Sequence, residues 1–296
     1  MLELNLKALA KINLGLDVIR RREDGYHEVK MVMQTIHLYD RIQLRRTKEP
    51  DIQVQTNLFY LPTNENNLVY KAAKLLKDEF QIPEGVDIHL KKFIPVAAGM
   101  AGGSSDAAAV LYGMNRMFRL GLSLQELMDR GVKIGADVPY CLMRGTALAE
   151  GIGEKLTPLR PVPKCPVLIA KPPISVSTKF VYENLKLDEH TVHPDMDAVV
   201  QAIEERNLKK MAANMGNVLE SVTCVHYPVI SQLKELMKEH GAIHAMMSGS
   251  GPTVFGLFED RGAAKAAMTV IRRQDLARQV YLTDMYNCSG PGRFVG

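Results

Sequence analysis

A glycine-rich segment between a predicted strand and a predicted helix constrains the fold of this chain more than any other feature. Residues 95–109 read PVAAGMAGGSSDAAA. The alternation in VDIHLKKF predicts a strand over 86–93, and the alanine-rich run after the glycines predicts a helix over 104–118. Three glycines within five residues remove side chains and permit positive φ, so that a ligand can approach the backbone closely.

We interpret this segment as a phosphate-binding loop. A strand, a glycine-rich turn and a helix N-terminus aim several backbone N–H groups and the positive end of the helix dipole at one point. A packing turn would explain an isolated glycine pair, but Ser104, Ser105 and Asp106 follow directly on the helix and favour phosphate. The sequence contains neither the Walker A pattern GxxxxGK[ST], nor the Rossmann pattern GxGxxG, nor the HRD and DFG motifs of protein kinases.

Composition excludes several other classes of protein. With 296 residues, 46% hydrophobic and 24% charged, the chain has the composition of an ordinary globular protein and is long enough for two domains. No apolar run approaches the roughly 20 residues that span a bilayer. The N-terminus lacks the basic-then-apolar order of a secretory signal, so we expect a cytoplasmic protein that does not bind membranes.

Charge and cysteine content favour a small anionic ligand over a polymer or a metal cluster. The net charge is +4, from 37 basic and 33 acidic residues, and the basic residues are dispersed. A nucleic-acid binder concentrates such charge and interleaves aromatic residues, whereas this chain has no tryptophan and is 6% aromatic. The four cysteines form no CxxC pair, which favours buried or free thiols and gives no indication of metal ligands.

Hydrophobic periodicity outlines the first half of the chain. Alternation through most of the first 57 residues predicts antiparallel strands joined by polar turns, one of which is REDGYHE. Helical spacing predicts helices over 66–80 and 123–135. The sequence GADVP, with Asp137 at its centre, follows at the end of the second of these helices.

A proline-rich stretch over 158–173 marks a predicted boundary between two domains, 1–157 and 158–296. It contains one predicted strand, over 166–171. Beyond it, alternating strands and helices predict an α+β sandwich around one small sheet. The expected helices cover 178–184, 195–205, 207–221, 228–240 and 261–274, and the expected strands are two within 242–260 and one over 278–285.

Two further segments carry polar residues or glycines in an apolar setting. In AKINLGL, Lys11 and Asn13 interrupt an apolar strand, and we expect them to place one side chain on each face, so that one points toward the core or a cleft. In SGSGPTVFG, over 248–256, glycines separate two predicted strands. Taken singly, this segment and GADVP are explained by an ordinary hairpin and an ordinary turn.

Together these segments resemble the GHMP kinase superfamily of small-molecule kinases. The central family motif is similar to residues 95–105, the N-terminal motif to residues 10–14 and the C-terminal glycine motif to residues 248–251. The combination of AKINLGLDV, REDGYHE and GADVP is most similar to the branch that acts on a cytidine diphosphate-linked methylerythritol. Met100 departs from the more usual leucine, but the exchange conserves side-chain volume.

The resemblance implies a fold, a reaction and cofactors. The fold would be α+β, with an N-terminal domain like ribosomal protein S5, a C-terminal ferredoxin-like sandwich and a cleft between them. The reaction would be transfer of the γ-phosphoryl group of ATP, with Mg²⁺, to the 2-hydroxyl of the methylerythritol moiety, in the non-mevalonate pathway to isoprenoid precursors. The expected assembly is a monomer or a homodimer.

The resemblance also implies roles for individual residues. Asp137 would accept the hydroxyl proton, Lys11 would lie beside it and keep it ionised, and Asn13 would bind the substrate or the carboxylate. The residues expected to bind ATP are Lys92, Pro95, Gly99, Ala101, Gly102, Gly103, Ser104 and Ser105. The residues expected to bind the alcohol substrate and its cytidine are Asn13, Tyr26, His27, Asp137, Thr178, Tyr182, Gly249 and Gly251.

Two other functions remain open at this point. The first is a different GHMP kinase, acting on homoserine or a mevalonate derivative, although the DGYH turn argues against it. The second is a non-catalytic protein that binds a nucleotide or RNA, because a fold does not imply a function. The presence of both Lys11 and Asp137, together with the dispersed basic charge, disfavours this second alternative.

Overall fold

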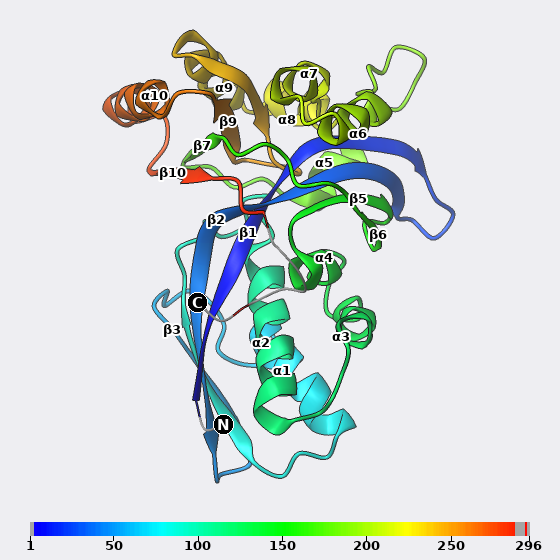
Figure 1. The fold of residues 1–296 in the computed structure, drawn as a ribbon, viewed down its shortest axis with the longest axis vertical. Helices are drawn as coiled ribbons and strands as arrows, with labels where there is room; N and C mark the ends of the chain where they lie inside the picture. Colours follow the sequence, from blue (N-terminus) through cyan, green and yellow to red (C-terminus); the bar gives the residue numbers. More distant parts are fainter. Residues whose placement is uncertain (1–2, 288–293, 295–296) are drawn as a thin grey trace.

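The architecture is built on two β-sheets, and two long strands of the larger sheet extend to the smaller one. The computed structural model describes residues 3–287 and Phe294. The larger sheet has the order β3-β4-β2-β5-β6, with β1 also paired to β2, and the smaller sheet has the order β10-β7-β9-β8. Figure 1 shows β1 and β2 rising from the lower half of the molecule and bending beneath the smaller sheet and its helices.

Strands β1 (Glu3–Arg21) and β2 (His27–Thr47) form the antiparallel hairpin expected from their alternating sequences. Register shifts after Leu9, Asn13 and Val18 interrupt the pairing, and such bulges bend a strand. The hairpin therefore belongs to the large sheet along its length and still reaches the second half of the chain, where Leu16 bridges Asn217 and Ile36 bridges Met285.

The third predicted strand pairs differently from our expectation of an antiparallel series. Strand β3 (Ile52–Thr56) lies parallel to β4 (Gly85–Lys91), and helix α1 (Leu68–Glu79) connects them. Parallel neighbours need a crossover connection, and α1 supplies it. The antiparallel prediction was wrong for β3 because alternation along one strand carries no information about the direction of its neighbour.

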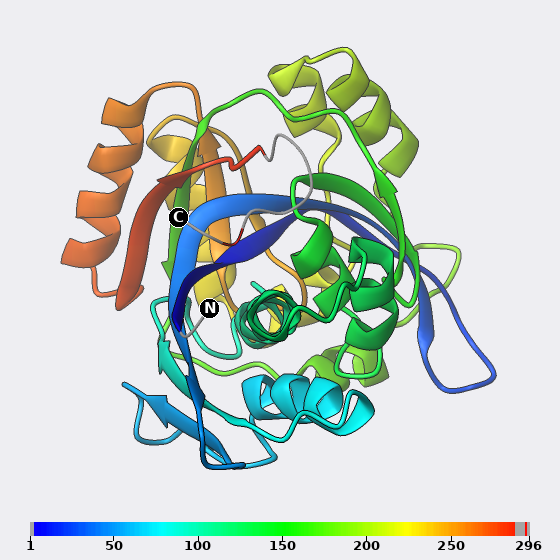
Figure 2. The same ribbon diagram turned by 60° about the horizontal axis from the view of Figure 1, so that its bottom comes forward.

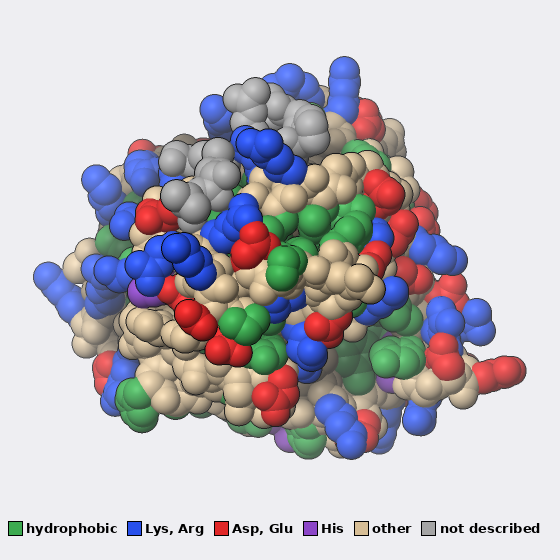
Figure 3. All heavy atoms as spheres, turned by 90° about the horizontal axis from the view of Figure 1, so that it is seen from below, with side chains coloured by type: hydrophobic (Ala, Val, Ile, Leu, Met, Phe, Trp, Pro, Cys, Tyr) green, Lys and Arg blue, Asp and Glu red, His purple; other side chains and the backbone are tan. Residues whose placement is uncertain are grey.

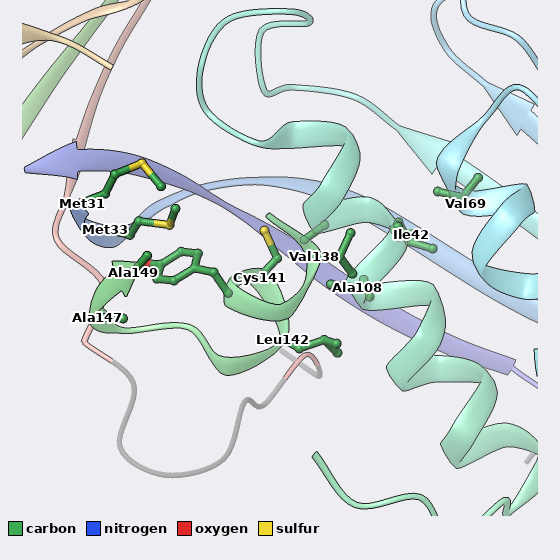
Figure 4. Close-up of a cluster of buried hydrophobic side chains, with 14 of the residues drawn as sticks. Met31, Met33, Ile42, Val69, Ala108, Val138, Cys141, Leu142, Ala147 and Ala149 are labelled. Atoms are coloured by element: carbon green, nitrogen blue, oxygen red, sulfur yellow. The ribbon is translucent and has the colours of Figure 1, made fainter. Parts of the chain in front are cut away.

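Helix α2 (Gly102–Phe118) is the central helix of the N-terminal half and begins two residues earlier than predicted. Figure 2 shows it almost end-on beneath β1 and β2. Helix α3 (Leu124–Gly131) ends four residues before the predicted stop, and a short helix α4 (Val138–Met143) follows. Figure 4 shows Val138 and Leu142 of α4 lying close to Ala108 of α2 in the buried cluster.

Strands β5 (Thr146–Gly151) and β6 (Lys155–Pro158) were absent from the sequence prediction. Strand β5 lies on β2, with Met33 opposite Ala147, and β6 forms a hairpin with β5. Buried and exposed residues do not alternate cleanly along β5, and β6 has no buried residue, so neither segment carries the period-two pattern of a half-buried strand.

The second half forms the predicted α+β layer. Its four strands are antiparallel throughout, and helices cover the sheet on one side, as the upper part of Figure 1 shows. Its elements are β7 (Pro166–Lys171), α5 (Thr178–Asn184), α6 (Met196–Glu204), α7 (Leu208–Asn214), α8 (Glu220–His226), α9 (Val229–Glu239), β8 (Ala242–Met247), β9 (Val254–Phe258), α10 (Arg261–Arg273) and β10 (Gln279–Asp284).

The single helix predicted over 207–221 is wrong, because the chain breaks between α7 and α8. At the break, Leu16 N donates to Gly216 O, and Val218 N donates to Leu16 O. The Asn217 side chain donates to the carbonyl oxygens of Met247 and Gly249. Long-range hydrogen bonds to β1 and to the β8–β9 turn therefore replace the helical ones.

The two halves share their hydrophobic core. Ile12 and Leu14 of β1 pack in one cluster with Ile169 of β7 and Phe255 of β9. The boundary predicted at 157/158 falls within β6, just before its last residue, and we keep it as a proposal. Among the residues that the structure describes, none of the helices is long and apolar enough to cross a membrane.

Candidate active site

A cavity of about 500 Å³ lies where the hairpin, the glycine-rich loop and the smaller sheet meet. Most of the predicted site residues line it. They are Lys11, Asn13, Lys92, Pro95, Gly99, Ala101, Gly102, Gly103, Ser104, Asp137, Thr178, Tyr182, Gly249 and Gly251. Tyr26, His27 and Ser105 do not line it.

The glycine-rich loop turns through left-handed backbone conformations before α2 begins. Ala97, Gly99 and Ala101 have φ of +50°, +71° and +53°. Ala101 is the residue at the N-cap of α2, and no side chain caps the helix. The N–H groups of the first turn therefore lie at the cavity without a side-chain acceptor, an arrangement suited to an anionic group.

The loop glycines have a different physical basis from the one we expected. A Cβ on Gly99 would lie 2.0 Å from the carbonyl oxygen of Ser248, and a Cβ on Gly102 would lie 3.2 Å from Lys92 Nζ. A Cβ on Gly103 would meet only Leu68, at 3.4 Å. Gly99 and Gly102 are thus explained by close packing against other parts of the protein, and space for a phosphate is not needed to explain them.

The second glycine turn is held directly against the first. The hydroxyl of Ser248 donates to Gly99 O over 2.9 Å, and Gly249 Cα lies beside Gly99. Gly249 and Gly251 both have positive φ, of +59° and +90°. The amide of Asn217, described above at the break between α7 and α8, fixes this turn from behind.

Lys11 and Asn13 both face the cavity, because positions two apart share a face of a strand. The prediction of opposite faces was therefore wrong. Lys11 Nζ donates to Asn13 Oδ1 over 2.7 Å. Within the described residues, no carboxylate oxygen lies within 4.0 Å of Lys11 Nζ, so the expected contact with Asp137 is not formed.

Asp137 occupies the N-cap position of α4, and its side chain makes no capping hydrogen bond. It lines the cavity as a partly buried carboxylate. The buried thiol of Cys141, one turn further along α4, lies within electrostatic reach of both Asp137 and Lys11. Burial raises the pKa of the Cys141 thiol, so it stays neutral and does not compete as a base.

Lys92 lies beneath the loop and is buried. Its ammonium donates to Asp40 on β2 and to Asp106 on α2, the latter over 2.6 Å. Burial by itself would lower the pKa of Lys92, but the two carboxylates outweigh it and raise the pKa. The ammonium is thus held by protein groups at the edge of the cavity.

The DGYH turn approaches the cavity through a ring contact between His27 and Tyr182 of α5, with centroids 4.8 Å apart. Desolvation, followed by the charge of Arg21, lowers the pKa of His27. Tyr26 is 61% exposed at the tip of the hairpin. The turn therefore presents one ring to the wall of the cavity and one to solvent.

Ser105 points away from the cavity, because its hydroxyl donates to Leu9 O over 2.7 Å. Sequence reasoning missed several lining residues, including Asn66, Asn67 and Ser250. Asn67 also caps α1, because its side chain accepts from Val69 N. Ser250 bonds to Thr178 over 2.8 Å, and only the tertiary structure reveals this pairing.

Family models match both halves of the chain around this cavity. The model described as the GHMP kinases N terminal domain matches residues 67–145, and the model described as GHMP kinases C terminal matches residues 199–275. The chain belongs to the GHMP kinase family. The kinase therefore has the two-domain fold expected for that family and uses ATP.

Full-length relatives resemble the kinase along nearly its whole sequence. A protein of Lachnospira eligens named 4-diphosphocytidyl-2-C-methyl-D-erythritol kinase is 59% identical over 97% of this chain and 99% of its own length. A protein of the same name from Alkaliphilus metalliredigens is 50% identical over 97% of this chain and 98% of its own length. The expected resemblance to this branch of the family is confirmed.

Solved structures agree with the family assignment. A crystal structure of 4-(cytidine 5'-diphospho)-2C-methyl-D-erythritol kinase superposes with a TM-score of 0.83 and 31% identity, covering 96% of this chain and all of the other. Homoserine kinase from Cytophaga hutchinsonii superposes with a TM-score of 0.78 at 18% identity, and the match covers 96% of this chain and 94% of the other. The second likeness extends to the fold alone.

Proposed function

We propose that this kinase transfers the γ-phosphoryl group of ATP to the 2-hydroxyl of 4-diphosphocytidyl-2-C-methyl-D-erythritol, a step of the non-mevalonate pathway to isoprenoid precursors. The observation that carries the proposal is the 59% identity, over nearly the full length of both chains, to a relative named for this substrate. The DGYH turn supports it, because its His27 contacts the ring of Tyr182, which lines the cavity. The proposal includes a cytoplasmic location and a monomer or homodimer.

Asp137 would act as the general base for the attacking hydroxyl. Its carboxylate lies in the cavity wall and is not used as a helix cap, which leaves it available to a substrate. Lys11, which lines the same cavity, would stabilise negative charge on the attacking oxygen. Asn13 holds the Lys11 ammonium and would orient it toward the substrate.

The glycine-rich loop would bind the ATP phosphates through backbone N–H groups at the start of α2. Ser104 and Gly103 line the cavity there, whereas Ser105 would support the loop through its bond to Leu9 O. Mg²⁺ would offset phosphate charge when bound. The described residues contain no group of three His, Cys, Asp or Glu side chains that could hold a metal ion. The ion would be held mainly by phosphate oxygens and water.

The cytidine would bind where the hairpin meets α5. His27 and Tyr182 supply aromatic faces and a ring nitrogen for the edge of the base, and Thr178 lies one turn before Tyr182. Tyr26, at the hairpin tip, would close over the outer face of the base. Gly249 and Gly251 would lie beside the phosphates of this substrate.

The test is ADP release from ATP and Mg²⁺ across a panel of alcohols. We expect turnover with 4-diphosphocytidyl-2-C-methyl-D-erythritol and none with homoserine or mevalonate. Turnover with either of the latter and not with the former would contradict the proposal. An RNA-binding assay addresses the non-catalytic alternative, for which Figure 3 gives no support, because basic and acidic side chains are interspersed on the face it shows.

A further inference from the structure

Three charged side chains are buried together beneath the glycine-rich loop. Asp40 of β2 is 0% exposed, Lys92 is 8% exposed and Asp106 of α2 is 2% exposed. We call these residues the buried triad. None of them is needed for the phosphoryl-transfer steps proposed above, yet Lys92 and Asp106 border the same cavity.

The buried triad ties the two ends of the loop to the large sheet. Asp40 Oδ1 accepts the backbone N–H groups of Phe93 and Ile94, where the chain enters the loop. Asp40 Oδ2 accepts from the Lys92 ammonium, which also donates to Asp106 Oδ2, where the chain leaves the loop. The position of the loop therefore depends on this network.

The two carboxylates have unequal numbers of hydrogen-bond donors. Asp40 receives three, from two backbone N–H groups and the Lys92 ammonium. Asp106 receives one, on Oδ2, and its Oδ1 is buried with no partner. A buried ionised oxygen without a donor is more unfavourable than a buried neutral hydroxyl without an acceptor, so if one of the two acids is protonated, the proton belongs on Asp106 Oδ1.

Charge balance leads to the same assignment. With both acids ionised, the buried triad would carry a net charge of −1 directly beneath a loop built for a polyphosphate. Desolvation raises the pKa of Asp106 well above its usual range; Lys92 opposes this rise and Asp40 adds to it. Cys141 on α4 interacts electrostatically with Asp106, and Tyr281 on β10 with Asp40; both have raised pKa values and add no charge. Asp106 lies five residues into α2, beyond the turn where the helix dipole is strong.

We propose that Asp106 is a protonated, neutral acid in the folded kinase, so that the buried triad is uncharged overall and positions the loop without repelling the nucleotide. The nucleotide part of this inference rests on the proposed function. Asp106 is then a positioning residue that acts through Lys92. The neutral state of Asp106 is expected in the folded protein whether or not a nucleotide is bound.

Infrared difference spectroscopy tests the protonation state directly. The spectrum of the wild type minus that of Asp106→Asn, at neutral pH, should contain the carbonyl stretch of a protonated carboxyl group. The matched control is Asp87→Asn, which removes an acid that Arg45 contacts at 2.6 Å, and should show only ionised carboxylate bands. Ionised carboxylate bands for Asp106 as well would overturn the proposal.

A second measurement needs no variant and covers the case in which Asp106→Asn fails to fold. Wild-type protein labelled with ¹³C-aspartate should show a protonated aspartyl band at neutral pH that is lost on unfolding. Its absence in the folded protein would contradict the inference.

Nucleotide affinity tests the consequence for the loop. Asn keeps an oxygen for the Lys92 ammonium and is uncharged at every pH, so ADP should bind Asp106→Asn within about twofold of the wild type, with the same pH dependence. Removing an ionised carboxylate from beneath the phosphates would instead tighten ADP by about tenfold or more, and a tenfold change in either direction contradicts the proposal. If the wild type bound no ADP, the proposed kinase function would be contradicted. The infrared measurements alone would then test the protonation state of Asp106.

Discussion

The α-carbon of Gly99 lies so close to Ser248 that a Cβ on Gly99 would come within 2.0 Å of the Ser248 carbonyl oxygen. The Ser248 hydroxyl reinforces this contact by donating to Gly99 O over 2.9 Å. The two glycine-rich segments are 149 residues apart in sequence and form one wall of the cavity. The first glycine of the loop is therefore explained by contact between the two halves of the chain.

Gly99→Ala should separate the two turns. We expect the free energy of unfolding to fall by about 3 kcal/mol or more, because a backbone atom cannot move aside as a flexible side chain can. Gly121→Ala is the matched control, since Gly121 also has positive φ, of +74°, but has nothing within 4 Å of its Cβ position. It should cost about 1 kcal/mol. Equal losses in urea unfolding would show that crowding at Ser248 is unimportant.

Asp137→Asn should leave folding and ATP binding intact and lower kcat by about 10²- to 10⁴-fold, because the variant cannot accept the hydroxyl proton. Asp129→Asn, at an exposed carboxylate on α3, is the control and should retain wild-type kcat. Steady-state ADP release and ATP titration measure both quantities. A near-normal kcat for Asp137→Asn would remove Asp137 from the role of base.

Tyr182→Leu should raise KM for the cytidine-containing substrate by about 3- to 10-fold, since a base-stacking contact contributes about 0.5 to 1.5 kcal/mol. KM for ATP should not change. Tyr182→Phe keeps the ring and should behave like the wild type. Burial raises the pKa of Tyr182 to about 12, so its hydroxyl adds no pH dependence below that value. An equal rise in both KM values would indicate a general distortion of the cavity.

His244 should make stability depend on pH. Burial, with help from Lys238 and Lys234, lowers its pKa from 6.5 to about 4. Above pH 6.5 His244 is neutral in both states; as pH falls toward 4 the unfolded chain takes up a proton that the folded chain excludes, and about 2 to 3 kcal/mol of stability is lost.

The check on His244 is urea unfolding at several pH values between 4 and 7. His244→Gln should flatten the dependence relative to the wild type, whereas His190→Gln, at an exposed histidine, should not. If both variants kept the wild-type slope, the loss of stability in acid would come from other groups.

Local sequence patterns determined much of the fold. Alternation predicted the β1–β2 hairpin and the strands of the second half, and helical spacing predicted α1, α2, α9 and α10. The three glycine- and lysine-containing segments together identified the family that the models and relatives later matched. These features are readable because each lies within a few consecutive residues.

Tertiary structure alone decided the features that depend on distant neighbours. The parallel pairing of β3 with β4, the break at Asn217 and the buried position of Lys92 all arise from partners far away in the sequence. The glycines of residues 99–103 are a further example. Their spacing in the sequence indicated a loop, but only the packing of Ser248 against Gly99 explains why position 99 is a glycine. A short stretch of sequence gives the identity of each residue. Its burial and its hydrogen bonds depend on which distant residues lie next to it in the folded chain.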